Sequence, residues 1–113
     1  MTRLYSAMPV LPSLDLAETE QAYGDLRFAV TVKAEGTLIL RRDQVELMFW
    51  PCPDRRICEA SGVYLRVGDV DALAAEAAAA GWRVTPPADQ PWGQREAYLF
   101  DPHGNLLRLG QPA

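Results

Sequence analysis

The chain is poor in the residues on which most catalytic and metal sites depend. Its 113 residues include one histidine, His103, and two cysteines, Cys52 and Cys58. A serine or cysteine nucleophile needs a histidine base that a third group holds in place. With His103 as the single histidine, neither a Ser-His-Asp nor a Cys-His arrangement is convincing. The cysteines stand close together without another cysteine pair or histidine nearby, which argues against zinc. We interpret both thiols as packing residues of a proline-rich loop and His103 as a solvent-exposed turn residue.

Basic residues and long apolar runs are also scarce. Eleven lysines and arginines stand against fifteen acids, a net charge of -4, whereas nucleic-acid binding needs a basic surface. No apolar run approaches the length of a membrane span, the N-terminus lacks the apolar stretch of a secretory signal, and no glycine-rich phosphate loop occurs. We therefore expect no nucleic-acid partner, no membrane association, and a cytoplasmic protein with reduced thiols.

The first half of the chain contains one series of secondary-structure signals. The length suits a single domain, 1–113, with a core of limited size. Pro9 lies within an apolar stretch, which indicates an edge strand or a strand exchanged between chains. Ser13 or Asp15 caps a helix that Gly24 ends. The strands predicted in this half are 4–11, 27–33, 37–41 and 44–50, followed by a linker at 51–56.

The second half repeats this order. Asp69 starts an alanine-rich helix that Gly81 ends. The strands predicted here are 63–67, 82–85, 96–100 and 106–109. Asp15 and Asp69 lie about half the chain apart, so strand-helix-strand-strand-strand occurs twice, in modules 1–52 and 60–113. We predict an α+β fold in which paired βαβββ modules form a curled mixed sheet around a cleft.

A tryptophan-bearing loop stands before the last hairpin, in Gln90-Pro91-Trp92-Gly93-Gln94-Arg95-Glu96. Pro91 restricts the backbone and Gly93 permits a positive φ, so Trp92 is held up on a turn. A displayed tryptophan beside a stiff hairpin is a stacking surface for a flat ligand, and the alternative is a tryptophan that caps the core. The segment Asp101-Pro102-His103-Gly104-Asn105 predicts the tight turn of the hairpin.

The order of elements and these two motifs resemble the bleomycin-resistance proteins of the glyoxalase/dioxygenase (vicinal oxygen chelate) superfamily. The resemblance covers nearly the whole chain. The Asp-Pro-x-Gly-Asn turn is shared by the superfamily, whereas Gln-Pro-Trp-Gly followed by Arg-Glu is more particular to the bleomycin-resistance branch. The resemblance implies a homodimer, in which the N-terminal strand is often exchanged between subunits.

The same resemblance locates the positions at which superfamily enzymes hold a divalent metal. With the internal repeat, the four positions fall on Met8, Met48, Gly62 and Arg108. A thioether, a missing side chain and a guanidinium do not replace the oxygen and imidazole donors that such a cation needs. We therefore predict no metal site, no cofactor and no enzymatic activity.

Strand periodicity and the resemblance together predict the ligand-binding residues. The aromatic side chains Trp50, Tyr64 and Trp92 would sandwich planar heteroaromatic rings, and Glu46 and Glu96 at the rim would meet cationic groups. A position in the core is the alternative for each aromatic. The complete predicted set is Trp92, Trp50, Phe28, Tyr64, Met48, Glu46, Glu96 and Arg108.

The resulting hypothesis is a metal-independent homodimeric protein that sequesters a planar, cationic ligand of the bleomycin type in a groove at the dimer interface. No bond would be made or broken. Two alternatives stay open because one fold carries many functions. One is a metal-dependent lyase or isomerase of the same superfamily, acting on a small oxygenated substrate through an unrecognised metal site. The other is an interaction protein whose cleft binds no small molecule.

Overall fold

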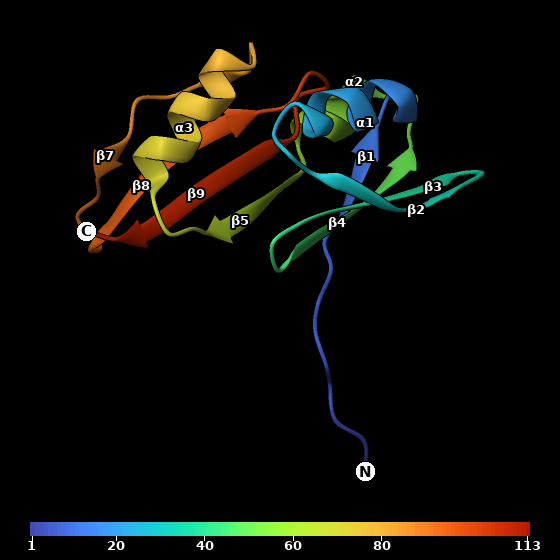
Figure 1. The fold of residues 1–113 in the computed structure, drawn as a ribbon, viewed down its shortest axis with the longest axis horizontal. Coiled ribbons are helices and arrows are strands. Elements are labelled where there is room, and N and C mark those ends of the chain that lie inside the picture. Colours follow the sequence, from blue (N-terminus) through green and yellow to red (C-terminus); the bar gives the residue numbers. More distant parts are fainter.

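Two mixed sheets lie side by side in the computed structural model, which describes residues 1–113, and the helices cover one side of both (Figure 1). The first sheet has the order β1-β4-β3-β2, with β1 parallel to β4 and the other pairs antiparallel. Its elements are β1 Val10–Ser13, α1 Leu16–Gly24, β2 Ala29–Ala34, β3 Thr37–Arg42 and β4 Val45–Pro51.

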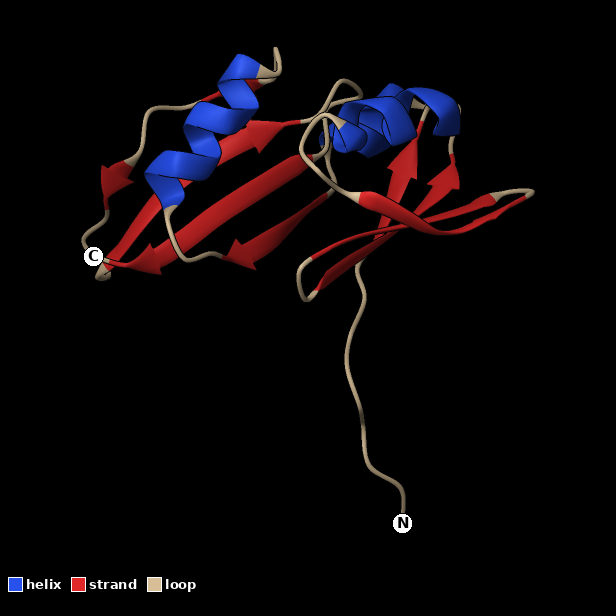
Figure 2. Cartoon of the chain, in the orientation of Figure 1, coloured by secondary structure: helices blue, strands red, loops and turns tan.

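The second half of the chain repeats this topology (Figure 2). Its sheet has the order β5-β9-β8-β6, with β5 parallel to β9, and the short β7 also pairs with β8. The elements are β5 Gly62–Arg66, α3 Val70–Ala79, β6 Arg83–Val84, β7 Ala88–Asp89, β8 Gln94–Phe100 and β9 Leu106–Pro112. The predicted α+β fold of paired βαβββ modules is confirmed, with the strands divided into one mixed sheet per module.

Local capping explains where the two long helices begin. The Asp15 carboxylate accepts hydrogen bonds from the backbone N–H groups of Ala17 and Glu18, at 2.9 and 3.1 Å. The Asp69 carboxylate accepts one from Ala72 at 3.0 Å. These bonds satisfy N–H groups that have no partner within the first turn of a helix. Both predicted helix starts are confirmed.

The largest differences from the predictions are two unpredicted elements and a displaced first strand. The predicted linker 51–56 contains the start of a short helix, α2 Arg55–Glu59, which Asp54 caps. The predicted loop 86–93 contains β7. The first strand begins at Val10 instead of Leu4, and residues 1–9 extend away from the body of the molecule (Figure 1). A β-strand forms only where its backbone can hydrogen-bond to a neighbouring strand. Pairing with β4 starts where the Met48 N–H donates to the Pro9 carbonyl at 3.0 Å, so β1 begins at the next residue.

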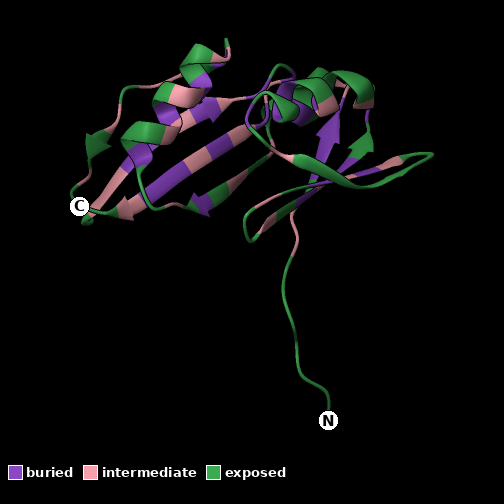
Figure 3. Cartoon of the chain, in the orientation of Figure 1, coloured by how far each residue is buried: buried purple, intermediate pink, exposed green.

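One hydrophobic core lies between the helices and the covered faces of both sheets (Figure 3). Tyr23 of α1 is fully buried at its centre, with its ring centroid 5.5 Å from that of Phe28 and 5.0 Å from those of Phe49 and Trp82. Trp82 is therefore a packing residue. Because Tyr23 belongs to the first module and Trp82 to the second, the aromatic cluster joins the two.

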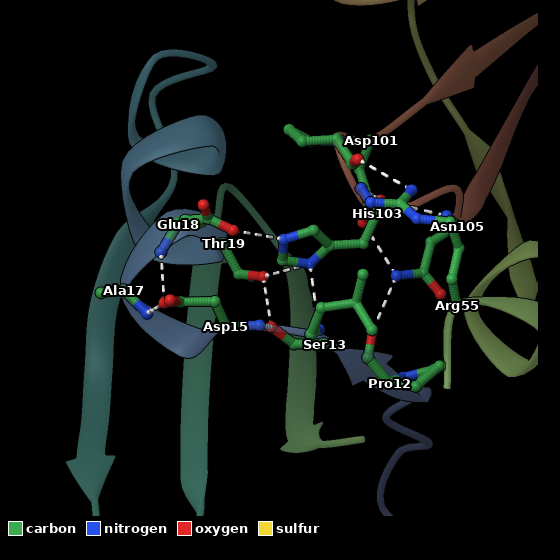
Figure 4. A network of polar contacts seen from close by, with 12 residues as sticks. Pro12, Ser13, Asp15, Ala17, Glu18, Thr19, Arg55, Asp101, His103 and Asn105 are labelled. Carbon is green, nitrogen blue, oxygen red and sulfur yellow. Dashed lines mark hydrogen bonds and ion pairs between the residues drawn. The ribbon is translucent and has the colours of Figure 1, made fainter. Parts of the chain in front are cut away.

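The turn between β8 and β9 also joins the modules, and here the prediction for His103 is wrong. The His103 side chain is 3% exposed. Its Nδ1 accepts a hydrogen bond from the Leu14 N–H at 3.2 Å, and its Nε2 lies 3.0 Å from the Glu18 carboxylate (Figure 4). This arrangement is that of an imidazole with its proton on Nε2. The turn docks against the start of α1, which shields the imidazole from water.

Asp101 organises the same turn from within. One oxygen of its carboxylate accepts from the backbone N–H groups of His103 and Asn105, at 2.9 and 3.0 Å. The Asn105 amide donates to the Pro12 carbonyl at 2.8 Å and to the other Asp101 oxygen at 2.9 Å. The Asp-Pro-x-Gly-Asn sequence thus shapes its own turn and holds β1 of the first module.

Cys52 ends the first module, and Cys58 lies in the segment that joins the two modules. Both cysteines are buried and free, which agrees with a packing role. The expectation that both lie in a loop is wrong for Cys58, which belongs to α2. Burial raises the pKa of the Cys58 thiol. No helix combines the length and the apolar character needed to cross a bilayer.

Candidate functional site

Each sheet has one face that no helix of the chain covers, which we call its open face. On the first sheet, Glu46, Met48 and Trp50 of β4 lie on the open face, because Leu47 and Phe49 between them are buried. Strand pairing places Val10 and Ile39 on either side of Met48. The predicted sharing of one strand face by the three β4 residues is confirmed.

The open face of the second sheet carries aromatic and charged side chains. Tyr64, Arg108 and Tyr98 lie in register across β5, β9 and β8. The Arg108 guanidinium lies 4.8 Å from the centroid of the Tyr98 ring, a cation–π contact. Leu65 and Leu107 point to the opposite face and are buried. The second open face therefore holds a cation supported by the Tyr98 ring.

The predicted display of Trp92 is confirmed, since this side chain is 62% exposed and does not cap the core. Its loop is closed by a hydrogen bond from the Gln90 N–H to the Gln94 carbonyl at 2.8 Å. Gly93 has a φ of 86°, which a residue with a side chain rarely adopts. The turn therefore raises the indole at the edge of the second open face.

Arg95, next along β8, holds this loop from the helix side. Its guanidinium forms salt bridges with Asp71 in the first turn of α3 at 2.9 Å and with Asp89 of β7 at 3.0 Å. Hydrogen bonds from Arg95 hold the pKa of Asp71 below its ordinary value, and the two carboxylates raise that of Arg95. The base of the Trp92 loop is thus tied to α3.

Glu96 points to the other side of β8, and its predicted position at an exposed rim is wrong. Its side chain is 3% exposed. One carboxylate oxygen, Oε2, accepts hydrogen bonds from the Tyr64 hydroxyl at 2.8 Å and from the Trp92 indole N–H at 3.1 Å. The hydrogen bond to Glu96 also raises the pKa of Tyr64. Glu96 is buried because these two larger side chains fold over it.

The last predicted residue, Phe28, lies in a cleft of about 840 Å³ between the modules. Tyr64 and Val45 line the same cleft, and Glu76 lies in its wall. Within one chain, the Glu96 carboxylate accepts hydrogen bonds from Tyr64 and Trp92. Arg108 lies opposite Tyr64 on the neighbouring strand. The residues Glu46, Met48 and Trp50 lie apart from this group, on the other sheet.

Sequence reasoning missed two residues of the second open face. Gly110 lies opposite Glu96 on β9, and a Cβ built there would stand 1.7 Å from the Tyr64 hydroxyl oxygen. A glycine inside an apolar strand pattern is the signal for such a close approach. Tyr98 follows Glu96 by two positions, so the alternation of β8 identifies it as a neighbour on the same face.

The four positions considered for a metal do not form a ligand set. Met8 lies in the extended N-terminal segment, and Met48 and Arg108 are on different sheets. At Gly62 an added Cβ would lie 2.6 Å from the Leu106 carbonyl oxygen, so this position is closed to a larger residue. No three His, Cys, Asp or Glu side chains are grouped so that they could hold a metal ion.

Several proteins that are similar to this chain in sequence or fold are described by resistance to bleomycin or by binding of it. Residues 13–109 match the family described as Glyoxalase/Bleomycin resistance protein/Dioxygenase superfamily. A bleomycin resistance protein of Klebsiella pneumoniae is 32% identical, over 93% of this chain and 90% of its own length. A bleomycin-binding protein solved in complex with bleomycin has a TM-score of 0.88 and 31% identity, covering 97% of this chain and 100% of its own. A bleomycin-binding protein from the bleomycin-producing Streptomyces verticillus, solved with copper(II)-bleomycin, has a TM-score of 0.84 and 26% identity, covering 96% and 97%.

Proposed function

Because the chain belongs to the glyoxalase/bleomycin resistance protein/dioxygenase superfamily, we propose that it binds and sequesters antibiotics of the bleomycin type without reacting with them. The observation that carries the proposal is the Trp92 indole, exposed on a rigid turn and hydrogen-bonded beside Tyr64. Flat heteroaromatic rings stack on such side chains. Whole-chain similarity to proteins that bind bleomycin supports the same ligand class.

A homodimer completes the site in this proposal. Val10 and Trp50 on the first open face are exposed, as are Leu4 and Tyr5 in the extended N-terminal segment. Exposed apolar side chains of this kind are typical of subunit interfaces. Residues 1–9 would cross to the partner, and the first open face of one subunit would face the second open face of the other. Two symmetric grooves result.

Each groove would take a flat ligand between aromatic side chains of both subunits. Trp50 and Met48 would form one wall, and Trp92 and Tyr64 the other. Glu46, which is exposed on the first open face, would meet a cationic group of the ligand. Phe28 and Arg108 would contact the remainder of the ligand. The protein supplies no metal in this proposal, so a copper ion in the groove would arrive with the drug.

Tryptophan fluorescence tests the proposal directly. Titration with metal-free bleomycin should quench the wild-type protein saturably, near one ligand per subunit. Trp92→Ala should weaken binding about tenfold, because a stacked ring contributes roughly 1.5 kcal/mol. Trp92→Phe, which keeps a ring, should bind between the two. The absence of quenching at any soluble drug concentration would remove bleomycin as the ligand.

The same preparation separates the proposal from an enzymatic role. A metal-dependent lyase or isomerase predicts stoichiometric metal on the purified protein and activity that a chelator abolishes. Bleomycin binding that is unchanged after chelation supports sequestration. Stoichiometric metal together with chelator-sensitive turnover contradicts it.

A further inference from the structure

Glu96 is the only buried acid on the second open face, and both of its hydrogen-bond donors are aromatic side chains. We propose that Glu96 is a positioning residue, which fixes the Trp92 indole and the Tyr64 phenol in one arrangement before a ligand binds. The expected gain in affinity for bleomycin from this positioning rests on the proposed function. The arrangement itself is formed by hydrogen bonds within a single chain.

The acceptor in this arrangement is rigid. Glu96 lies within β8, paired with Ala88 of β7 on one side and Gly110 of β9 on the other. Its Oε2 receives both donors, at 2.8 Å from Tyr64 and 3.1 Å from Trp92. Hydrogen bonds to a carboxylate are stronger than those between neutral groups. A single fixed oxygen therefore sets the orientation of two rings.

Gly110 makes the contact with Tyr64 possible. Tyr64 belongs to β5, so its side chain must cross β9 to reach Glu96 on β8. It passes directly over Gly110, where an added Cβ would lie 1.7 Å from the hydroxyl oxygen and 2.4 Å from Cζ. Any other residue at this position would push Tyr64 away from Glu96.

Trp92 is held at two levels. Arg95 ties the backbone of its loop to α3 and β7 through Asp71 and Asp89. Glu96 holds the ring itself on the opposite side of β8. An exposed indole without this bond would sample several rotamers, and fixing one of them on binding costs conformational entropy. The adjacent arginine and glutamate thus act on the two faces of the strand.

The second carboxylate oxygen indicates that this acid does more than stabilise the fold. Oε1 of Glu96 is buried and has no hydrogen-bond partner. A buried polar atom without a partner lowers stability, and functional sites are one place where proteins retain such atoms. Glutamine offers one acceptor oxygen in the same shape, so Glu96→Gln keeps both aromatic contacts and Glu96→Ala removes them.

The indole N–H groups report this arrangement without a ligand. The three tryptophans give three indole signals in a ¹⁵N-correlated NMR spectrum, and Trp92→Phe identifies that of Trp92. In the wild type, the Trp92 N–H should exchange with water more slowly than that of Trp50, although Trp92 is the more exposed residue. Glu96→Ala should abolish this protection, and Glu96→Gln should restore it. Gly110→Ala should displace Tyr64 and leave the Trp92 signal in place.

Bleomycin titration then measures what the positioning contributes. Metal-free bleomycin should bind Glu96→Ala about three- to tenfold more weakly than wild type, the equivalent of immobilising one or two side chains. Glu96→Gln should recover most of this loss. Unchanged Trp92 exchange in a folded Glu96→Ala variant overturns the inference. If that variant does not fold, fast wild-type exchange of the Trp92 N–H, equal to that of Trp50, overturns it instead.

The two proposals fail separately. A wild-type protein that does not bind bleomycin contradicts the proposed function, and the indole exchange rates still decide the role of Glu96. A wild-type protein that binds bleomycin as tightly as its folded Glu96→Ala variant contradicts the positioning role and leaves sequestration standing.

Discussion

At the scale of single residues, the most highly connected side chain is the buried carboxylate of Asp101. It accepts hydrogen bonds from two backbone N–H groups, from the Asn105 amide and from the Tyr23 hydroxyl. Burial, followed by the charge of Asp101, raises the pKa of Tyr23 well above its ordinary value. Tyr23 therefore remains a proton donor throughout the normal pH range.

Tyr23→Phe should destabilise the protein by roughly 1.5 to 3 kcal/mol, because it removes a hydrogen bond to a buried charge. The measurement is the free energy of unfolding from urea denaturation. Tyr98→Phe is the matched control, since the Tyr98 ring supports Arg108 on an open face and its loss of a hydroxyl should cost little. Equal free energies for the two variants would contradict this role of Tyr23.

The residues that sequence reasoning placed wrongly have partners far away in the chain. Turn chemistry next to Trp92 is local, so its display was predictable from Pro91 and Gly93. Burial of His103 depends on Leu14 and Glu18, and burial of Glu96 depends on Tyr64. No local pattern contains those contacts, so both side chains were expected in solvent.

At the scale of elements, short-range signals determine most boundaries. The two aspartate caps mark the predicted helix starts. The positive φ angles at Gly36 and Asp43 mark predicted turns, and that at Gly81 marks the predicted end of a helix. The five-residue α2 and the two-residue β7 were not predicted, because segments this short show no detectable hydrophobic periodicity. The first strand was misplaced because pairing, not apolar character, decides where β1 begins.

Asp69→Ala should lower the free energy of unfolding by about 1 kcal/mol, because the first turn of α3 loses the acceptor for the Ala72 N–H. Asp69→Ser should recover most of the loss, since serine also caps helices well. Thermal or urea denaturation of the three proteins measures both effects. An alanine variant as stable as wild type would show that packing alone defines the start of α3.

At the scale of the whole molecule, a single acid connects the modules across their cleft. Glu76 of α3 accepts from Arg27 at 2.8 Å and from Arg42 of β3 at 3.1 Å. The hydrogen bond from Arg27, followed by that from Arg42, holds the pKa of Glu76 below its ordinary value of 4.5. A lowered carboxylate pKa stabilises the folded state above that ordinary value, and the benefit disappears as the pH falls through the folded-state pKa.

Glu76→Gln should therefore reduce stability near pH 7 by less than about 1 kcal/mol, because the pairs are partly exposed. The difference from wild type should shrink as the pH falls below 4.5. Urea denaturation between about pH 3 and 7 measures the curve. Glu35→Gln, in the turn between β2 and β3, is the control and should follow wild type. A constant difference at every pH would exclude the ionic contribution.

The N-terminal segment makes the other prediction at this scale. Removal of residues 1–7 should convert the proposed dimer to a monomer and abolish saturable bleomycin binding, because each groove then lacks one wall. Sedimentation velocity and the fluorescence titration measure the two effects. Arg3→Ala, an exposed polar change in the same segment, is the control. A truncated protein that remains dimeric would exclude strand exchange as the basis of assembly.

The turn at Asp101–Asn105 has a consequence for the order in which the protein folds during synthesis. The Pro12 carbonyl and the Tyr23 hydroxyl belong to the first module, yet their partners are Asn105 and Asp101. A nascent chain therefore cannot complete its first module until residue 105 has left the ribosome. Closing such long loops is entropically costly and slows folding. Until then, the first half is an unfinished folding unit that depends on the last hairpin.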